Sequence, residues 1–439
     1  MSDRIKEALY KIKEFNIDFL RLQFVDILGI PKNVEIPVKK AEAALYEGVG
    51  FDGSSIEGFV RIEESDMRLF PDVDTFMVLP WEEERKVARM ICDVKKPDGE
   101  LFEGCPRTNL KKHLEKLGKR GWTLKVGTEA EFFILRYSDG KIVTSDRGSY
   151  FDLLPLDTEE GLRRDMVIAL EKLGLNIEAA HHEVGHSQHE IDFEYGDALS
   201  IADNVITLKI AVKTLALRRG YVATFMPKPF FGVAGSGMHT HLSLFEGEKN
   251  LFYDPQAPDG LSKIARGFIA GLLQHARAYA AITNPLVNSY KRLVPGYEAP
   301  VYVAWAEKNR SPLVRVPPQR GKGTRAELRN PDPACNPYLA FSVILVAGMD
   351  GVDRELDPGK PLNNVNLYQL SEGEREEWGI DFLPSSLEEA LKALEEDEVI
   401  KSALTPHILD YYLKAKKEEW KEYKNTVHPW EIERYLELY

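Results

Sequence analysis

The sequence predicts an α+β protein with a small N-terminal domain built on a mixed sheet and a larger C-terminal domain. Residues 16–96 hold short runs in which apolar and polar residues alternate, as they do in half-buried strands. The segment KKPDGELFEGCPR, residues 95–107, is rich in Pro, Gly and Asp, so we expect turns and a domain boundary there. Beyond it, long helical stretches are interspersed with strand-like runs, and no internal repeat is visible.

The elements can be placed in order along the chain. The first 15 residues form a charged amphipathic stretch. Strand-like runs at 17–38, 75–81 and 87–94 follow, with a helical stretch at Ala41–Tyr46. Period and end signals then predict three helices. These are Glu159–Leu173 with Asp157 as N-cap, Ile201–Arg219 ended by Gly220, and Ser262–Ala281 before Asn284-Pro285. We expect the strands of the larger domain to lie between these helices.

Composition limits the class of protein. With 439 residues, of which 44% are hydrophobic, the chain can form two or three domains with a packed core. A net charge of −13 argues against non-specific binding to nucleic acid or anionic membranes, and no apolar run approaches the roughly 18 residues of a membrane span. The N-terminus lacks the apolar core of a signal peptide, so we expect a cytoplasmic protein. Three cysteines without C-x-x-C spacing support neither a disulfide frame nor a cysteine zinc site.

Residues 179–193, AAHHEVGHSQHEIDF, contain an H-E-x-x-H string, the spacing by which a helix presents two zinc ligands. The surrounding residues favour strands instead, because Ile191, Phe193 and Tyr195 alternate with acidic residues. A glycine inside the supposed helix would also cost roughly 1 kcal/mol relative to alanine. We therefore predict a strand, a turn and a strand, with Glu183 and Glu190 close together across the mouth of the hairpin, and not a zinc protease.

Further strand-like runs carry polar pairs at a spacing of two, which places each pair on one face of its strand. The pairs are Glu129 with Glu131, His239 with His241, and the set Arg325, Glu327 and Arg329. Any one pair is typical of a solvated outer face. If the strands line one sheet or barrel interior, however, five glutamates and a histidine converge. Such a donor set selects Mg²⁺ or Mn²⁺, and two ions with three protein ligands each leave positions open for phosphoryl oxygens.

Arginines are the expected companions of such a site, because the guanidinium group binds phosphate and carboxylate through two parallel hydrogen bonds. Residues 289–329 supply them among loop-forming Pro and Gly: Arg292, Arg310, Arg315, Arg320, Arg325 and Arg329. The alternative is that they are surface arginines of a basic loop. By itself this chemistry indicates metal-dependent phosphoryl transfer and does not identify the acceptor.

A series of motifs resembles, in order and over nearly the whole chain, glutamine synthetase of the bacterial and archaeal type I. The motifs are FDGSSIEGF, GTEAEFF, HHEVGHSQHE, TFMPKP, GSGMHTHLSLF, NSYKRLVPGYEAP, NRSPLVRVP and RAELRNPDPACNPYLA. The resemblance implies ATP-dependent condensation of L-glutamate with ammonia through a γ-glutamyl phosphate. It also implies an N-terminal β-grasp-like domain, residues 1–103, and a catalytic domain, residues 104–439, with a curved antiparallel sheet flanked by helices.

The resemblance also implies roles for individual residues. Glu131, Glu183 and Glu190 match the ligands of one Mg²⁺ or Mn²⁺ ion, and Glu129, His239 and Glu327 those of a second. The residues matched to glutamate and ammonium binding are Tyr150, Gly235, Arg292, Glu298, Arg310 and Arg329. Those matched to ATP binding are Glu178, His241, Ser243, Arg310, Arg315 and Arg325. Asp52, Glu298 and Arg310 match catalytic residues, and Asp52 is expected to reach into the site of a neighbouring subunit.

Two departures accompany the resemblance. Ala234 stands where many family members have asparagine, which puts one contact to the glutamate backbone in doubt. The chain is also short, like the subtype that is not adenylylated, so Tyr368 is expected to be unmodified, and Arg61 matches a residue linked to glutamine feedback.

The resemblance further implies a homododecamer of two stacked hexameric rings, with the C-terminal VHPWEIERYLELY joining the rings; a terminal helix packed on its own subunit is the alternative. Two other functions stay open at this point. One is a ligase that joins a γ-glutamyl group to a polyamine or another amine, and the other is a catalytically silent relative with a structural or regulatory role. A nitrogen-responsive regulatory protein is a further possible partner.

Overall fold

The computed structural model describes residues 2–58, 66–296, 299–363, 365, 367, 370 and 372–439. Three residues singled out in the sequence, Arg61, Glu298 and Tyr368, lie outside the described residues. Helices and strands alternate irregularly along the chain and form two sheets, which confirms the predicted α+β class.

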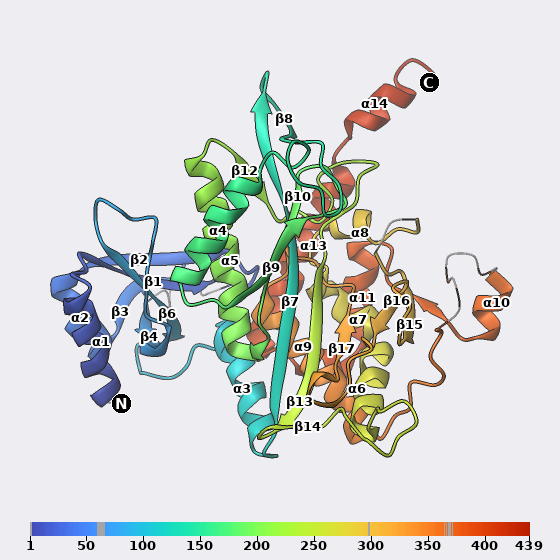
Figure 1. Ribbon diagram of the computed structural model, residues 1–439, viewed down its shortest axis with the longest axis horizontal. Coiled ribbons are helices and arrows are strands. Elements are labelled where there is room, and N and C mark those ends of the chain that lie inside the picture. Colours follow the sequence, from blue (N-terminus) through green and yellow to red (C-terminus); the bar gives the residue numbers. More distant parts are fainter. Residues whose placement is uncertain are drawn as a thin grey trace.

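The N-terminal region forms the predicted mixed sheet (blue in Figure 1). Its strand order is β2-β1-β6-β4-β3, with β5 also paired to β6; β1 runs parallel to β6 and the other pairs are antiparallel. The elements are α1 (Ser2–Glu14), β1 (Phe19–Val25), β2 (Pro31–Pro37), α2 (Ala41–Glu47), β3 (Val49–Asp52), β4 (Asp66–Pro71), β5 (Met77–Val78) and β6 (Val87–Lys95). Apolar residues of α1 and α2 pack with the strands into a core separate from that of the larger sheet.

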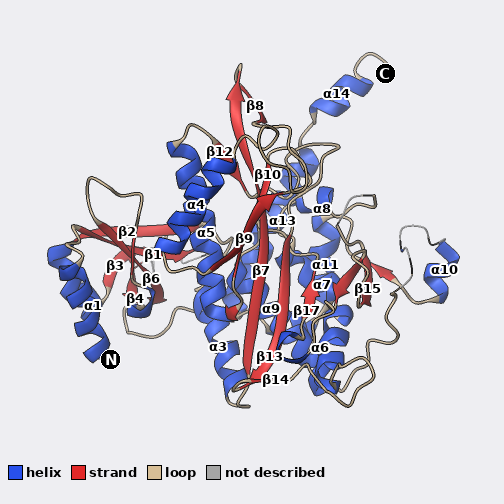
Figure 2. Cartoon of the chain, in the orientation of Figure 1, coloured by secondary structure: helices blue, strands red, loops and turns tan. Residues whose placement is uncertain are grey.

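The second sheet has the order β18-β15-β16-β17-β13-β7-β10-β9, with four further short strands paired to β7 or β13. Figures 1 and 2 show β7 and β13 at the centre of the molecule. The strands are β7 (Thr123–Ser138), β8 (Lys141–Thr144), β9 (Ile177–His182), β10 (Gln188–Phe193), β11 (Gly196–Asp197), β12 (Val222–Thr224), β13 (Met238–Glu246), β14 (Lys249–Asn250), β15 (Tyr302–Ala306), β16 (Pro312–Arg315), β17 (Ala326–Leu328) and β18 (Asp381–Phe382).

The larger sheet is mainly antiparallel, as expected, and contains one parallel pair among the described strands. β15 and β16 run parallel, with Tyr302 opposite Pro312 and Ala306 opposite Arg315. The connection of residues 307–311 is long enough for this, because five extended residues span up to about 17 Å and can lead the chain back along a short strand. The HExxH segment forms the antiparallel hairpin β9–β10, as predicted, with Glu190 opposite His181.

The helices lie beside the larger sheet, where α3, α5 and α6 contact its strands. Their bounds are α3 (Pro106–Gly118), α4 (Glu160–Lys172), α5 (Ala198–Arg218), α6 (Lys263–Gln274), α7 (Ala276–Thr283), α8 (Ser289–Arg292), α9 (Pro337–Asp353), α10 (Glu372–Glu377), α11 (Leu387–Glu396), α12 (Glu398–Ser402), α13 (Pro406–Asn425) and α14 (Pro429–Tyr435). None of the helices in the described part of the chain has the length and apolar character needed to cross a membrane.

Two details of the predicted helices were wrong. The cap of α4 is Glu159, because Asp157 is buried and its carboxylate accepts from the Glu159 amide. The single helix expected at 262–281 is divided into α6 and α7 at His275. The ring of His275 lies 2.6 Å from an oxygen of Asp397 and 3.0 Å from one of Asp350, and these two long-range contacts hold its position.

The C-terminal helix α14 extends away from the rest of the chain (Figure 1), and none of its residues is buried. Trp430, Ile432 and Leu436 are exposed on it or at its end. The alternative of a terminal helix packed on its own subunit is therefore wrong for this chain.

Arg107 of α3 connects the two sheets through a buried ion network. Its guanidinium lies 2.9 Å from Asp72 and 3.0 Å from Asp93 on the N-terminal side, and 2.9 Å from Asp203 of α5. Tyr338 donates a 2.6 Å hydrogen bond to the same Asp203. Because a buried charge without a partner is costly, these ion pairs help to hold the small sheet against the larger one, together with hydrogen bonds such as that from Arg89 to Thr207.

Replacing Arg107 by methionine should lower the free energy of unfolding by about 3–5 kcal/mol, because Asp203 loses its ion pair and Asp72 and Asp93 keep only Lys111. The matched control is Arg120→Met, which breaks an exposed pair with Asp353 and should cost about 0–1 kcal/mol. Urea titrations at one protein concentration measure both. Equal shifts for the two variants would contradict a special role for Arg107.

Candidate active site

Three strands bring together Glu129 of β7, His239 of β13 and Glu327 of β17, which we call the Glu129 group. His239 lies opposite Glu129 in the β13–β7 pair, and Glu327 lies opposite His241 in the β13–β17 pair. One donor atom from each member lies within 4.8 Å of the others. The structure thus gathers the set predicted for one metal ion.

Hydrogen bonds and ion pairs hold the two carboxylates of this group in the charged form. Burial alone would raise the pKa of Glu129, but hydrogen bonds from His239 (3.2 Å) and His241 (2.7 Å) outweigh it and hold that pKa far below its usual range. Burial likewise opposes ionisation of Glu327, yet Arg329 and His241 lower its pKa. Arg329 pairs with Oε1 of Glu327, and Arg315 Nε lies 2.5 Å from Oε2. Two carboxylates and an imidazole suit a hard divalent cation.

The three-glutamate group consists of Glu131, Glu183 and Glu190. It lies toward β10, the neighbour of β7 on the edge opposite to β13. Glu131 pairs with Glu190 across β7 and β10, and Glu183 follows the end of β9. Burial and the Glu183 carboxylate raise the pKa of Glu131 to about 8, and burial with Asp192 and Glu131 raises that of Glu190 well above its usual value. Carboxylates that repel one another in this way provide the electrostatic environment that a divalent cation would neutralise.

The three-glutamate group is looser than the Glu129 group. Among the described residues, one possible ligand atom of Glu190 lies within 4.8 Å of such atoms of His181 and Asp192. Within the same part of the chain, Glu131 and Glu183 do not belong to a group of this kind. Sequence reasoning assigned no role to His181 or Asp192. A signal for Asp192 was present, since it follows Glu190 by two residues on the same face of β10. His181 could be found only from the register, which places it opposite Glu190.

A cleft of about 320 Å³ adjoins the Glu129 group. Its lining includes four residues predicted for the nucleotide, namely Glu178, His241, Ser243 and Arg325, together with Glu129. Arg325 Nε donates to His241 Nδ1 over 3.1 Å. The proton of a neutral His241 therefore sits on Nε2, from which it is donated to Glu129. Arg315 and Arg310 are not among the residues that line this cleft.

A smaller pocket of about 30 Å³ adjoins the three-glutamate group and is lined by Ala234, Gly235 and Arg292, among others. Arg292 is buried and donates to the carbonyl oxygens of Asn330 and Arg329 over 2.7 and 3.2 Å. A side chain at Gly235 would meet the Pro227 carbonyl at 2.5 Å, so the close approach of backbone requires glycine. The pocket must widen before it can admit an amino acid.

The remaining predicted residues lie in three places. Arg329 is buried and paired with Glu327. Tyr150 is half-exposed beside the three-glutamate group: burial and Glu183 raise the pKa of its hydroxyl, and the nearby, exposed Arg310 acts in the opposite direction. Asp52 lies at the end of β3 in the N-terminal sheet, apart from the central strands (Figure 1), so this subunit does not bring it to its own cluster.

Comparisons with known proteins agree over the full length. Residues 16–97 match the family model described as glutamine synthetase, beta-Grasp domain, and residues 103–435 that described as glutamine synthetase, catalytic domain. Curated proteins named glutamine synthetase from Methanosarcina mazei, Thermotoga maritima and Thermus thermophilus are 53%, 54% and 55% identical to this chain. The alignments cover 97–99% of this chain and 98–99% of those proteins. A solved structure described as a GmaS/ADP complex superposes with a TM-score of 0.90 at 33% identity, covering 98% of this chain and 99% of that one.

A divalent cation should stabilise the protein more at pH 8 than at pH 6. The raised pKa of Glu131, about 8, means that below this pH a cation must displace a proton, at a cost of about tenfold in apparent affinity per pH unit. The sign for the metal-free protein is opposite. The unfolded chain releases this proton near pH 4.5 and the folded one near 8, so stability falls as pH rises between these values.

The measurement is the shift in melting temperature caused by a fixed Mg²⁺ concentration at each pH. Glu131→Gln, which has no carboxyl group to titrate at this position, should reduce the pH dependence, and the part that remains comes from Glu190, whose pKa is also raised. A shift that is equal at both pH values, or larger at pH 6, would contradict the assignment.

Proposed function

Because the chain belongs to the glutamine synthetase family, we propose that it joins L-glutamate to ammonia, with ATP as phosphoryl donor, to make L-glutamine. The observation that carries the proposal is the pair of acidic groups on either side of β7. The Glu129 group adjoins the cleft of about 320 Å³, and the three-glutamate group adjoins the Arg292 pocket. A γ-phosphoryl group and a γ-carboxylate could thus meet between the two.

Two Mg²⁺ or Mn²⁺ ions are the proposed cofactors, held by Glu131, Glu183 and Glu190 and by Glu129, His239 and Glu327. When bound, they would neutralise phosphate charge and orient the carboxylate. The donor sets fit such ions, because carboxylates and imidazole are ligands that Mn²⁺ and Mg²⁺ accept.

The residues of this chain would then divide the work. Glu178, His241, Ser243 and Arg325 bind ATP at the larger cleft, and Gly235 and Arg292 bind glutamate at the smaller pocket. Arg310, Arg315 and Arg329 stabilise negative charge on the transferring phosphoryl group, because guanidinium donors match its oxygens. Phosphorylation converts the γ-carboxylate into an acyl phosphate, whose phosphate is a good leaving group.

Ammonium must lose a proton before it can attack, so carboxylate bases are needed close by. We assign this task to Asp52 and Glu298, with Tyr150 in the same pocket. Asp52 belongs to the N-terminal sheet, away from the cluster of its own subunit, so it would serve the site of a neighbouring subunit. This requires an oligomer, and we propose the homododecamer of two hexameric rings with the exposed α14 as a contact between rings.

Further features of the proposal concern domains and cell context. We propose domains at residues 1–103 and 104–439, a cytoplasmic location, Arg61 as part of feedback by glutamine, and a nitrogen-regulatory protein as a partner. A ligase acting on an amine is the rival function. The similarity to the GmaS/ADP complex, at 33% identity, is the reason for testing it. Identity of 53–55% to proteins named glutamine synthetase favours ammonia.

A panel of amines should separate these functions. With ATP, Mg²⁺ and glutamate, ammonia should give one glutamine per phosphate released, and hydroxylamine should give γ-glutamyl hydroxamate, because an acyl phosphate accepts any small nucleophile that fits. Methylamine and polyamines should react much more slowly. Glu327→Gln, made in parallel, should lose most of this activity and so exclude a contaminating enzyme. Faster turnover with an alkylamine than with ammonia would reassign the protein to the rival function.

Mixed reassembly should test the shared site. Asp52→Ala and Arg310→Ala should each be nearly inactive, the first for lack of a base and the second for lack of a charge that stabilises phosphoryl transfer. If the two are dissociated together and reassembled, some interfaces pair an intact Asp52 with an intact Arg310, and part of the glutamine synthesis should return. Each variant reassembled alone is the control and must stay inactive. Efficient mixing without any recovery would exclude the composite site.

A further inference from the structure

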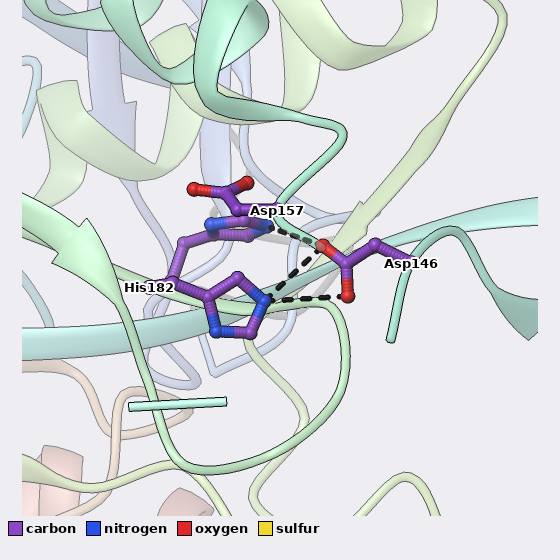
Figure 3. A group of neighbouring side chains, drawn as sticks. Asp146, Asp157 and His182 are labelled. Atoms are coloured by element: carbon purple, nitrogen blue, oxygen red, sulfur yellow. Dashed lines mark hydrogen bonds and ion pairs between the residues drawn. The ribbon is translucent and has the colours of Figure 1, made fainter. Parts of the chain in front are cut away.

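A buried cluster of ionisable side chains lies directly behind the three-glutamate group. It contains Asp146, Asp157, Arg163, His182 and His189, and each of these residues is less than a tenth exposed. His182 is the last residue of β9, His189 lies in β10 and Arg163 in α4. Figure 3 shows the His182 ring directed at the Asp146 carboxylate, with Asp157 nearby. None of the five has a role in the function proposed above.

Although one donor atom from each of the two histidines and two aspartates lies within 4.8 Å of the others, the hydrogen bonds argue against a metal site here. Arg163 Nη1 lies 2.8 Å from His189 Nδ1, and a guanidinium can only donate. The proton of a neutral His189 must therefore sit on Nε2, the atom that faces Asp146 at 4.0 Å and would have to bind the metal. Arg163 also occupies Asp157, at 2.6 Å. Two cations already face two carboxylates if His182 is charged, which leaves no excess negative charge for a metal ion.

His182 joins this cluster to the backbone of Glu183. Its Nδ1 lies 2.7 Å from the carbonyl oxygen of Glu183, which can only accept, so Nδ1 is the donor. Its Nε2 lies 3.1 and 3.3 Å from the two oxygens of Asp146. The ring also packs on Gly148, where a side chain would come within 2.5 Å of Nε2.

Asp146 in turn holds the turn between β9 and β10. It accepts from the Ser187 amide over 2.7 Å and from the Gly148 amide over 3.2 Å. Ser187 has a positive φ of 65°, a conformation that needs support from its surroundings. The turn is closed by a 2.8 Å bond from the Glu183 amide to the Gln188 carbonyl. Both backbone polar groups of Glu183 are thus fixed, one by the hairpin and the other by His182.

We propose that His182, held by Asp146, is a positioning residue that sets the direction of the Glu183 carboxylate within the three-glutamate group. Among the described residues, the hydrogen bonds of the Glu183 side chain are short-range, with the His181 ring at 2.8 Å and the Val184 amide at 3.0 Å. Its reach toward Glu131 and Glu190 therefore depends on where the backbone of residue 183 lies. The inference rests on the proposed function only for the identification of this group as a metal site.

Direct titration of the assembled protein with Mn²⁺, followed by electron paramagnetic resonance of the unbound ion, tests the proposal without turnover. His182→Ala and Asp146→Asn should weaken one class of Mn²⁺ site by about tenfold or more, as outer partners of metal ligands typically do. His182→Asn, whose amide can still donate to the Glu183 carbonyl, should retain most of the affinity. Should His182→Ala fail to assemble, His182→Gln, which reaches Asp146 but not that carbonyl, replaces it.

The matched control is Asp157→Asn, which disturbs the same buried cluster through Arg163. Within the described residues, the side chain of Asp157 bonds to Arg163 and the Glu159 amide and not to the 183–187 turn. This substitution should lower the melting temperature and leave Mn²⁺ affinity within about twofold. Equal weakening in Asp157→Asn and Asp146→Asn, or no weakening in Asp146→Asn, would overturn the positioning role. Stoichiometric zinc in the purified protein that is lost in Asp157→Asn would overturn it too. If the wild-type protein binds Mn²⁺ but makes no glutamine, the proposed function fails while this comparison still decides the role of His182.

Discussion

Electrostatic repulsion among buried carboxylates is the constraint on which the arrangement around β7 depends. Glu129 and Glu131 stand two residues apart on one strand, and each meets further acids from neighbouring strands. In water these charges would ionise near their usual pKa values, but burial makes each charge costly. The surroundings of these carboxylates differ between the β13 edge and the β10 edge of β7.

On the β13 side the protein itself supplies the compensating partners, hydrogen bonds from histidines for Glu129 and positive charge from arginines for Glu327. Histidines contact Glu129, and two arginines flank Glu327, so both carboxylates stay ionised. On the β10 side no arginine contacts Glu131 or Glu190 through an ion pair among the described residues, and the pKa values of both groups are raised. The Glu129 group thus forms an anionic wall beside the cleft lined by Glu178, His241 and Arg325. The Glu131 and Glu190 carboxyl groups of the three-glutamate group therefore favour the protonated form, and a divalent cation bound there would replace those protons.

The scaffold keeps these charges in place through buried polar groups that are themselves well paired. Arg107 links the small sheet to the large domain, and the His182–Asp146 pair links the β9–β10 turn to the loop before α4. Both are fully surrounded by protein, where a hydrogen-bonded ion pair has specific geometry and few alternative arrangements.

The sequence by itself determined whatever depends on neighbours along the chain. Alternation at period two placed Glu129 and Glu131 on one face, and it identified the β9–β10 hairpin despite the HExxH string, because side-chain direction in a strand repeats every two residues. The motif resemblance added the family and its roles, among them those of Arg61 and Glu298, which lie outside the described residues.

Only the tertiary structure decided which strands are neighbours and in what register. It put His239 opposite Glu129, brought His181 and Asp192 to Glu190, turned β15 and β16 parallel, and divided the helix at His275. The physical reason is that these pairings join residues far apart in sequence. Packing and long-range ion pairs must outweigh the entropic cost of closing the loops between them, and no local sequence pattern records that balance.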